Sequence, residues 1–444
     1  MKSEHPECLL PKLTHLSKPN IPFIAQSVNL SYSSVFGYHL TAKQNLRPGN
    51  IIMTESPYSA PLLPDFWYEK CATCLKCGYL NLIPCRGCSF AMFCSNECMT
   101  KGFQEFHQYE CPIMQDIGEL LSAEALIGLR NTLKGFCLYE NLAELQEVFD
   151  HRFDGRQEDF DLEVMNCDAK TMFRVICHQA TNQERRSIED LLNLSLTAGV
   201  IYKLLVFKTD LILKLETPEQ HYLLMEMLLH FLQIATINSF SMTCLPEISL
   251  NTSKGTRVET EHEFAIATYP FSSFLNHSCA PNVTKTNAGP SHETMLVVVT
   301  RPIKVNEQIF DCYFTSVHHY RSTKRERQKL LYEQYNFQCS CMACQLNFPL
   351  YKDLKIKCPM LNLMEIISGN ASLGRFSEKK LILQKYQEYC QFLREFDECY
   401  PCKEIYVVHK CLLRCIWLLY KRLQVIHKPS PKSQKDIIFN LDNH

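Results

Sequence analysis

The sequence predicts a mixed α+β protein, in which strand-rich segments are separated by a cysteine-rich segment and a helical one. Strand-like alternation of apolar and polar residues occurs near residues 36–52 and returns only after residue 262. Eight cysteines and one histidine lie within residues 71–111. Apolar residues recur every three or four positions, as in helices packed on a core, over 120–133, 191–213, 222–237, 379–396 and 404–423. The length of 444 residues allows roughly two to four domains.

The composition indicates a reduced compartment and metal-bound cysteines. The chain has 24 cysteines, and its N-terminal residues contain no apolar signal-peptide core. The most apolar stretch, 405–425, is interrupted by basic residues, so we expect an intracellular protein with no membrane span. Clustered cysteines in such a protein are more often metal ligands than disulfides. A net charge of −1 argues against direct binding of nucleic acid by the molecule as a whole.

Four pairs of potential ligands follow one another in the cysteine-rich segment, at the short spacings that let two side chains reach one tetrahedral ion. The pairs are Cys71-x2-Cys74, Cys85-x2-Cys88, Cys94-x3-Cys98 and His107-x3-Cys111. A three-residue gap places both ligands on one face of a helical turn. Eight ligands make two zinc sites, and structural zinc stabilises small fingers by about 10–16 kcal/mol. Cys74-x2-Cys77 is an alternative first pair.

A second group of cysteines lies far downstream. Cys339-x-Cys341-x2-Cys344 offers three thiolates, one fewer than a closed tetrahedral site requires. The polar segment Asn276-His277-Ser278-Cys279 supplies a further cysteine upstream. A third zinc site therefore needs a ligand from a distant part of the chain.

The cysteine-rich segment resembles a MYND zinc finger, on the strength of Phe93-Cys94-Ser95-x2-Cys98 and His107-x2-Glu110-Cys111. The resemblance implies that the first and third pairs hold one ion, and the second and fourth pairs hold the other. The implied ligand sets are Cys71, Cys74, Cys94 and Cys98, and then Cys85, Cys88, His107 and Cys111. Such fingers usually bind partner peptides, so the resemblance also implies peptide-motif partners for this one.

The Asn276–Cys279 run and the downstream cysteine motif are similar to the signature and the post-SET motif of SET domain lysine methyltransferases. In the SET-and-MYND branch of that family, Cys279 would be the fourth ligand of the post-SET zinc ion, which makes three structural zinc ions in all. The Gly37-Tyr38-His39-Leu40 form and the Cys312-Tyr313 pair most resemble the fourth member of the branch. We expect the N-terminal TPR array of that relative to be missing here.

The resemblance implies a split SET β-fold interrupted by the finger, with a helical insertion, a post-SET motif and a helical, TPR-like C-terminal domain. The expected divisions are an N-terminal segment 1–27, the first SET part 28–70, the MYND finger 71–111, the helical insertion 112–237, the SET core 238–316, the post-SET segment 317–345, the C-terminal domain 346–428 and a flexible tail 429–444.

The resemblance also implies the reaction: transfer of a methyl group from S-adenosyl-L-methionine to a lysine of a histone or non-histone protein. Tyr313 and Tyr335 match the catalytic tyrosines at the transfer site and in the lysine channel. The positions that match cofactor contacts are Tyr38, His39, Asn238, Asn276, His277, Tyr313 and Phe337. From the family we expect a monomer in the nucleus and cytoplasm.

An alternative function rests on departures from the family pattern, at Asn306-Glu307-Gln308, where the family usually has Gly-Glu-Glu, and above all in the cofactor loop. The cofactor loop of the family is commonly Lys/Arg-Gly-Arg-Gly, whereas this sequence has Phe36-Gly37-Tyr38-His39. A second glycine would let the backbone approach the cofactor closely, and His39 stands in its place. Tyr38 cannot replace the positive charge of the family's arginine. The alternative is a catalytically weak adaptor, a transcriptional co-regulator that recruits partner proteins.

Overall fold

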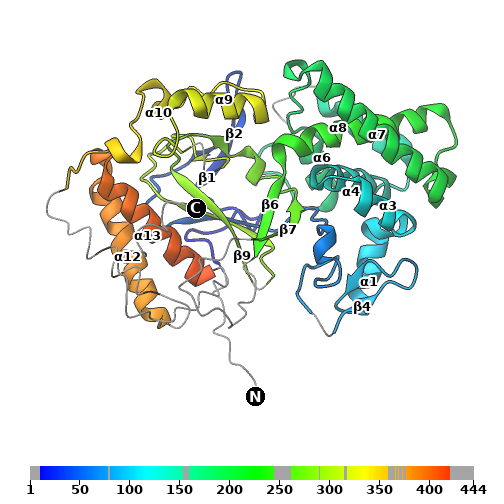
Figure 1. Ribbon diagram of the computed structural model, residues 1–444, viewed down its shortest axis with the longest axis horizontal. Coiled ribbons are helices and arrows are strands. Elements are labelled where there is room, and N and C mark those ends of the chain that lie inside the picture. The colour runs from blue at the N-terminus through cyan, green and yellow to red at the C-terminus, as the bar shows by residue number, and fades with distance from the viewer. Residues whose placement is uncertain are drawn as a thin grey trace.

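A computed structural model gives the arrangement of the chain. The structure describes residues 11–78, 81–153, 160–244, 262–289, 291–314, 318–358 and 377–420, together with 366, 369 and 373. In Figure 1 short sheets occupy the centre, α12 (Lys379–Glu395) and α13 (Lys403–Tyr420) lie on one side, and the long helices that precede the second strand-rich segment lie on the other. The prediction of a mixed α+β protein is confirmed.

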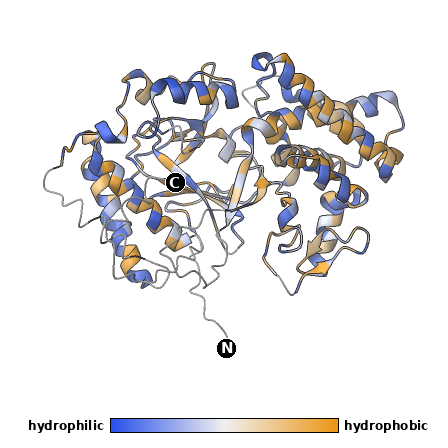
Figure 2. Cartoon of the chain, in the orientation of Figure 1, coloured by the Kyte–Doolittle hydropathy of each residue, from blue (hydrophilic) through white to orange (hydrophobic). Residues whose placement is uncertain are grey.

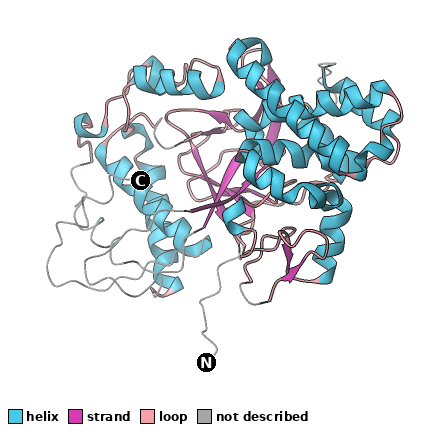
Figure 3. Ribbon diagram, turned by 45° about the vertical axis from the view of Figure 1, so that its right-hand side comes forward, coloured by secondary structure: helices cyan, strands magenta, loops and turns pink. Residues whose placement is uncertain are grey.

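Strands from before and after the cysteine-rich and helical segments pair with one another. β10 (Thr294–Val299) is the middle strand of an antiparallel sheet, between β3 (Ile51–Glu55) and β9 (Val283–Ala288). Figure 3 shows most of the strands at the centre of the molecule with helices on both sides. The remaining two-stranded pairs are β1 (Val28–Ser33) with β2 (Gly37–Ala42), β4 (Ile83–Pro84) with β5 (Met92–Phe93), and β6 (Phe240–Cys244) with β7 (His262–Ala267).

One parallel pair stands apart from these antiparallel ones. β8 (Asn276–His277) runs beside β11 (Phe310–Asp311). The Asn282 side chain stabilises the start of β11. Its amide donates to the Gln308 carbonyl at 2.9 Å, and its oxygen accepts the Phe310 N–H at 2.7 Å. The polar Asn276–Cys279 run is thereby fixed against the segment that carries Tyr313.

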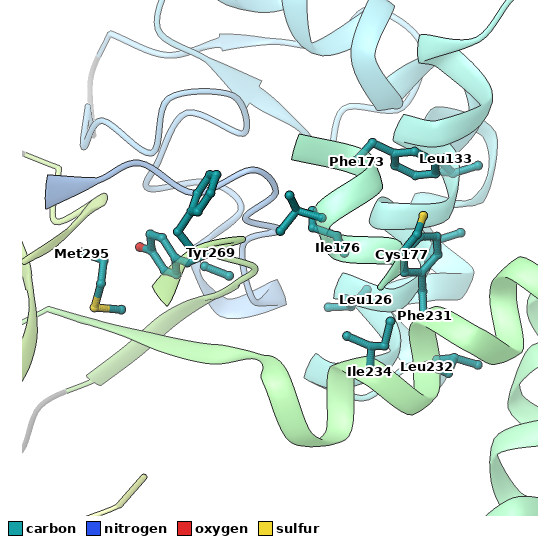
Figure 4. Close-up of a cluster of buried hydrophobic side chains, with 14 of the residues drawn as sticks. Leu126, Leu133, Phe173, Ile176, Cys177, Phe231, Leu232, Ile234, Tyr269 and Met295 are labelled. Atoms are coloured by element: carbon teal, nitrogen blue, oxygen red, sulfur yellow. The ribbon is translucent and has the colours of Figure 1, made fainter. Parts of the chain in front are cut away.

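The helices between the two strand-rich segments build most of the core. α4 (Ala123–Leu138) packs on α8 (Pro218–Asn238), and the three remaining long members are α5 (Leu142–Asp150), α6 (Ala169–Cys177) and α7 (Ile188–Lys208). Figure 4 shows Phe173 and Phe231 among the buried side chains of this helical cluster, with Tyr269 beside it. Apolar spacing predicted α4, α7 and α8 to within a few residues of their observed bounds.

The surface of α7 departs from the sequence expectation. This helix is apolar and long enough to cross a membrane by length and composition, and only 22% of its most apolar stretch is buried in the protein. Leu194, Ala198, Ile201 and Leu205 face the core. The other face exposes large apolar side chains, namely Ile188, Leu192, Leu196, Val200 and Phe207, and Figure 2 shows hydrophobic residues along it. One such helix is weak evidence for a membrane span, but the face has an unusual amount of exposed apolar surface.

The C-terminal helices form a second hydrophobic cluster with the back of the sheet. α12 and α13 pack side by side, and their buried residues contact Leu296 and Val298 of β10. The Tyr386 hydroxyl donates to the Gly49 carbonyl at 2.8 Å, which ties α12 to the turn before β3. The predicted tail, 429–444, lies outside the described residues.

A buried carboxylate joins the two strand-rich segments. Glu55, at the end of β3, is fully buried and accepts the N–H groups of Phe271 and Ser272, both at 2.8 Å. The Ser272 hydroxyl donates to the same carboxylate at 2.6 Å. Burial raises the pKa of Glu55 to about 7, although these three donors act in the opposite direction. The segment that leads into Asn276 is therefore anchored to β3.

Glu55→Gln should destabilise the protein, because an amide has one acceptor oxygen and places an NH2 group against backbone donors. We expect a loss of about 1–3 kcal/mol. The folded pKa of Glu55 lies above its unfolded value, so its contribution to stability is fully present at acid pH and is lost as the pH rises through about 7. The difference in Tm between wild type and Glu55→Gln, followed by scanning fluorimetry, should therefore shrink from pH 5 to pH 8. Glu119→Gln, at an exposed position, should show no such trend.

Candidate active site and metal centres

Two groups of four ligands lie in the cysteine-rich segment, each with its ligand atoms within 4.8 Å of one another. The groups are Cys71, Cys74, Cys94 and Cys98, and Cys85, Cys88, His107 and Cys111, the same sets that the resemblance implied. The Sγ atoms of Cys74 and Cys94 are 3.4 Å apart, and those of Cys85 and Cys111 are 3.7 Å apart. Two thiolates on one tetrahedral zinc ion lie about 3.7 Å apart, so both groups fit zinc.

Local structure explains why these short pairs converge. Ser95 caps α1 (Asn96–Gly102) by accepting the Cys98 N–H at 3.2 Å, which turns Cys98 toward Cys94. Gly87 lies where a Cβ atom would come within 2.7 Å of the Cys111 sulfur, so the turn between the second pair requires glycine. Burial lowers the pKa of His107 to about 4, which leaves its ring neutral, the form that binds metal. Cys77, the alternative ligand, is exposed and lies outside both groups.

A third group unites Cys279 with Cys339, Cys341 and Cys344. The Cys279 sulfur lies 3.9 Å from that of Cys339 and 3.7 Å from that of Cys344, again the spacing of a tetrahedral site. Arg327 of α9 (Lys324–Tyr335) is fully buried, and its guanidinium lies 3.6 Å from the Cys344 sulfur. A cation beside four thiolates offsets their excess negative charge, and no local spacing in the sequence pointed to this arginine.

His277 connects the third metal group to the aromatic residues. Burial lowers the pKa of His277 to about 4, so the ring is neutral. Its Nδ1 accepts the Tyr313 N–H at 3.2 Å, which places the ring proton on Nε2. Nε2 lies 3.4 Å from the Cys279 sulfur and donates to it. Both ring nitrogens of His277 are therefore engaged within the protein, and the predicted contact of this residue with the cofactor is left to its backbone or ring face.

Tyr313 and Phe337 lie beside His277, and Tyr335 lies beside both of them. The ring of Tyr313 lies 4.7 Å from that of Tyr335 and 5.1 Å from that of His277, between centroids. Phe337 lies 6.3 Å from Tyr313 and 6.1 Å from His277. Desolvation, with smaller contributions from Tyr335 and Asp311, raises the pKa of Tyr313 well above its usual range. Desolvation also raises the pKa of Tyr335, to about 12, so both hydroxyls stay protonated at neutral pH.

The predicted cofactor loop lies beside this cluster. Gly37 has a φ of +62°, which opens the turn between β1 and β2. The Asn276 amide donates to the Phe36 carbonyl at 3.1 Å, and Nδ1 of His39 lies 2.9 Å from the Gly37 carbonyl oxygen. The rings of Phe36 and His39 lie 5.8 Å apart. Asn276 and His39 thus border one loop.

Tyr38 and Asn238 are placed differently. Side chains alternate along a strand, and the Tyr38 ring turns from His39 to pack against Phe160 at 5.3 Å and Phe274 at 5.9 Å. Asn238, at the end of α8, donates to the Ala180 carbonyl at 3.4 Å. Two residues further along, the Asn182 amide donates to the Tyr335 carbonyl at 3.0 Å. The short 180–182 loop therefore links Asn238 to the aromatic cluster, whereas the partly buried Tyr38 side chain packs against the main hydrophobic core.

An ion pair beside Tyr313 was not predicted from the sequence. Lys285 of β9 pairs with the buried Asp311 at 2.6 Å. The Lys285 amine also lies 5.7 Å from the centre of the Tyr313 ring. Burial raises the pKa of Asp311, and Lys285 opposes that shift. A single lysine on an alternating strand gives no motif, so only the fold reveals its position.

Comparison with known proteins places the chain in a family. The SET domain family model matches residues 37–314, more than half of the chain. The chain belongs to the SET domain family. It is 25% identical to protein-lysine N-methyltransferase SMYD4 of Danio rerio over 75% of its own length and 54% of that protein's. Its identity is 24% with Homo sapiens SMYD4, over 72% of this chain and 46% of the relative, and 23% with Homo sapiens histone-lysine N-methyltransferase SMYD3, over 70% and 59%. The resemblance to SET-and-MYND proteins is confirmed.

This member of the SET domain family spans about half the length of the SMYD4 relatives that it matches. A crystal structure of the SET domain of LSMT bound to lysine and AdoHcy shares 13% identity with it, at a TM-score of 0.29, over 91% of this chain and 86% of the other. A superposition with that score does not align individual site residues.

Loss of the third metal group should disturb the aromatic cluster, whereas loss of a finger site should not. Cys341→Ser and Cys98→Ser should each bind one zinc ion fewer than wild type, measured by plasma mass spectrometry. Cys341→Ser should also release His277 and expose the Tyr313 N–H, so hydrogen exchange of a peptide spanning 310–314 should quicken by about tenfold or more. Cys98→Ser is the control. Equal exchange in the two variants would contradict the link through His277.

Proposed function

We propose that this SET domain protein is an S-adenosylmethionine-dependent protein-lysine N-methyltransferase, acting on a lysine of a histone or non-histone protein. The observation that carries the proposal is the meeting of Tyr313, Tyr335, Phe337 and His277 beside the parallel pair of β8 and β11. The relatives named as lysine methyltransferases support the same reaction.

In this proposal the aromatic residues position the reactants and exclude water. Bound S-adenosyl-L-methionine would supply a methyl group on a positively charged sulfur. Asn276 and the backbone of the 36–39 loop offer polar groups to hold its amino-acid portion, and Phe337 offers a ring face to its adenine. The Tyr313 hydroxyl, which stays protonated, orients the reacting groups, and the Tyr335 ring lines the path of the substrate lysine. Alignment of two reactants in a dry site is the main contribution that such a protein makes to methyl transfer.

The substrate lysine must lose its proton before its nitrogen attacks the methyl group. A nearby unpaired carboxylate would stabilise the charged, protonated form of the amine and so oppose this loss. Asp311 lies close to Tyr313, but its charge is neutralised by Lys285 at 2.6 Å. The ion pair therefore leaves the site without a net negative charge at this point, which favours the neutral amine.

Tyr313→Phe should abolish methyl transfer, with a loss of at least about 10²–10³-fold in kcat, because the ring is kept and only the orienting hydroxyl is removed. The measurement is transfer of radiolabelled methyl groups to a histone mixture and to a library of lysine peptides. Zinc content and Tm should not change.

Tyr332→Phe is the matched control, since Tyr332 lies on the exposed face of α9. It should methylate at the wild-type rate. Transfer by Tyr313→Phe at the rate of wild type would show that the transfer site has been assigned to the wrong residue.

Calorimetric titration with S-adenosylmethionine tests the cofactor site independently of the substrate. We expect micromolar binding by the zinc-replete protein, and a Kd raised by about tenfold in Asn276→Ala, as befits the loss of a hydrogen bond to a charged ligand. Asn193→Ala, at an exposed position of α7, should bind as wild type does. Absence of binding by the folded wild-type protein would favour an adaptor instead.

The adaptor is the second candidate function, and the exposed face of α7 favours it. Ile188 is 86% exposed and Phe207 is 74% exposed, at opposite ends of the helix. An apolar surface of this kind is typical of a protein-binding face. In this alternative the SET fold is catalytically weak and the chain recruits partners as a transcriptional co-regulator.

The finer assignments belong to the same proposal. The two interleaved ligand groups support a MYND finger that binds partner peptides, and the packed pair α12 and α13 supports a short TPR-like domain. We propose zinc in each group, the residue divisions given above, and a monomer that acts in the nucleus and cytoplasm without direct binding to nucleic acid or membrane.

A further inference from the structure

A fourth group of metal-ligating side chains lies outside the sites described above. Cys358, Cys402 and Glu404 are all buried, and one ligand atom from each lies within 4.8 Å of the others. The thiol of Cys399 lies outside this group of three but within hydrogen-bonding reach of that of Cys358, so a turn of its side chain would be needed to bring it onto the same ion. Cys399-Tyr400-Pro401-Cys402 is a Cys-x2-Cys pair, which has the spacing of a metal-binding turn.

The carboxylate of Glu404 provides independent evidence for a ligand. Its Oε1 accepts the N–H groups of Lys357 at 2.8 Å and Cys358 at 2.7 Å. Its Oε2 is buried and accepts no N–H or O–H hydrogen bond from the described residues, and the thiol of Cys402 lies within hydrogen-bonding reach of the carboxylate. A thiol is a weak hydrogen-bond donor and leaves a buried carboxylate poorly satisfied, whereas a cation among the neighbouring thiolates would satisfy it.

We propose that Cys358, Cys399, Cys402 and Glu404 form a fourth zinc centre, in addition to the three that the cysteine motifs predict. Three thiolates select a soft or borderline ion over magnesium or calcium, and zinc accepts a carboxylate as its fourth ligand. Glu404 lies in the first turn of α13, where the helix dipole offsets its negative charge.

The centre would fasten the chain after the post-SET motif to the turn between α12 and α13. Tyr400, inside the Cys-x2-Cys pair, has its hydroxyl 2.8 Å from Nε2 of His319. Its ring lies 3.8 Å from the Arg301 guanidinium, which in turn pairs with Asp397 at 2.8 Å. Zinc at this point would hold the C-terminal helices in register with the SET core.

A disulfide explains the same residues less well. A bond between Cys358 and either other cysteine would use two of the three sulfurs. It would leave the third thiol and the Glu404 carboxylate outside the bond. A metal ion uses all four groups at once.

Zinc content of the full-length chain, purified with reductant, tests the proposal. Cys402→Ser should bind one zinc ion fewer than wild type, by plasma mass spectrometry. Cys415→Ala is the matched control, because Cys415 is a buried cysteine of α13, the helix that begins directly after Cys402, and it belongs to none of the four groups. It should keep the wild-type zinc content. Equal zinc in Cys402→Ser and wild type would overturn the proposal.

Alkylation of the wild-type protein provides a test that does not depend on how the variants fold. Cys399 is partly exposed, so as a free thiol it would react with N-ethylmaleimide. In the zinc-loaded protein we expect Cys399 to resist alkylation until a chelator is added, whereas the exposed Cys77 reacts in both conditions. Peptide mass spectrometry distinguishes the two. Reaction of Cys399 at the rate of Cys77 in the loaded protein, or a disulfide among the three cysteines, would overturn the proposal.

Discussion

The three hydrogen bonds to the buried carboxylate of Glu55 fix the geometry on which the rest of the site depends. They connect β3 to Phe271 and Ser272 across a separation of 216 and 217 residues. The cysteine-rich segment and the helical segment both lie between these points in the sequence, so the SET fold forms only when its two parts meet. The anchored segment continues directly into Asn276 and His277. Glu55 therefore governs the position of the aromatic cluster, although it lies remote from that cluster.

The neutral ring of His277 connects the anchored segment to the aromatic cluster through hydrogen bonds. One nitrogen receives the Tyr313 N–H and the other donates to the Cys279 sulfur. A metal ion on Cys279 would therefore set the orientation of the ring, and the ring sets the backbone of Tyr313. In this arrangement a structural metal influences the site without touching a reactant, as is common for the hydrogen-bonded surroundings of metal ligands.

Local patterns predicted part of this arrangement, and the remainder depends on contacts between distant residues. Two features are local and were predicted from the sequence. They are the short spacings of the cysteine pairs and the apolar periodicity of α4, α8, α12 and α13. The pairing of the four finger motifs came from the family resemblance, since spacing cannot choose between adjacent and interleaved partners. Lys285 and Asp311 lie on different strands, and Cys358 is separated from Cys402 by the whole of α12. Such neighbours carry no signal in a single sequence.

Three of the four cysteine groups lie where little apolar surface is buried, which indicates what their metal ions would contribute. Of the buried residues described in the finger cluster, Cys71 and Cys85 are ligands and only Ala91 and Phe93 are not. The post-SET cluster is similar, with Cys279, Cys339 and Cys344 beside a few small or aliphatic side chains. These segments contain too little apolar surface to fold without cross-links. The C-terminal helices differ, because α12 and α13 bury an extensive apolar cluster of their own against β10. A metal ion held by Cys402 and Glu404 would therefore add little to the folding of those helices, and its contribution would be to hold them in place beside the SET core.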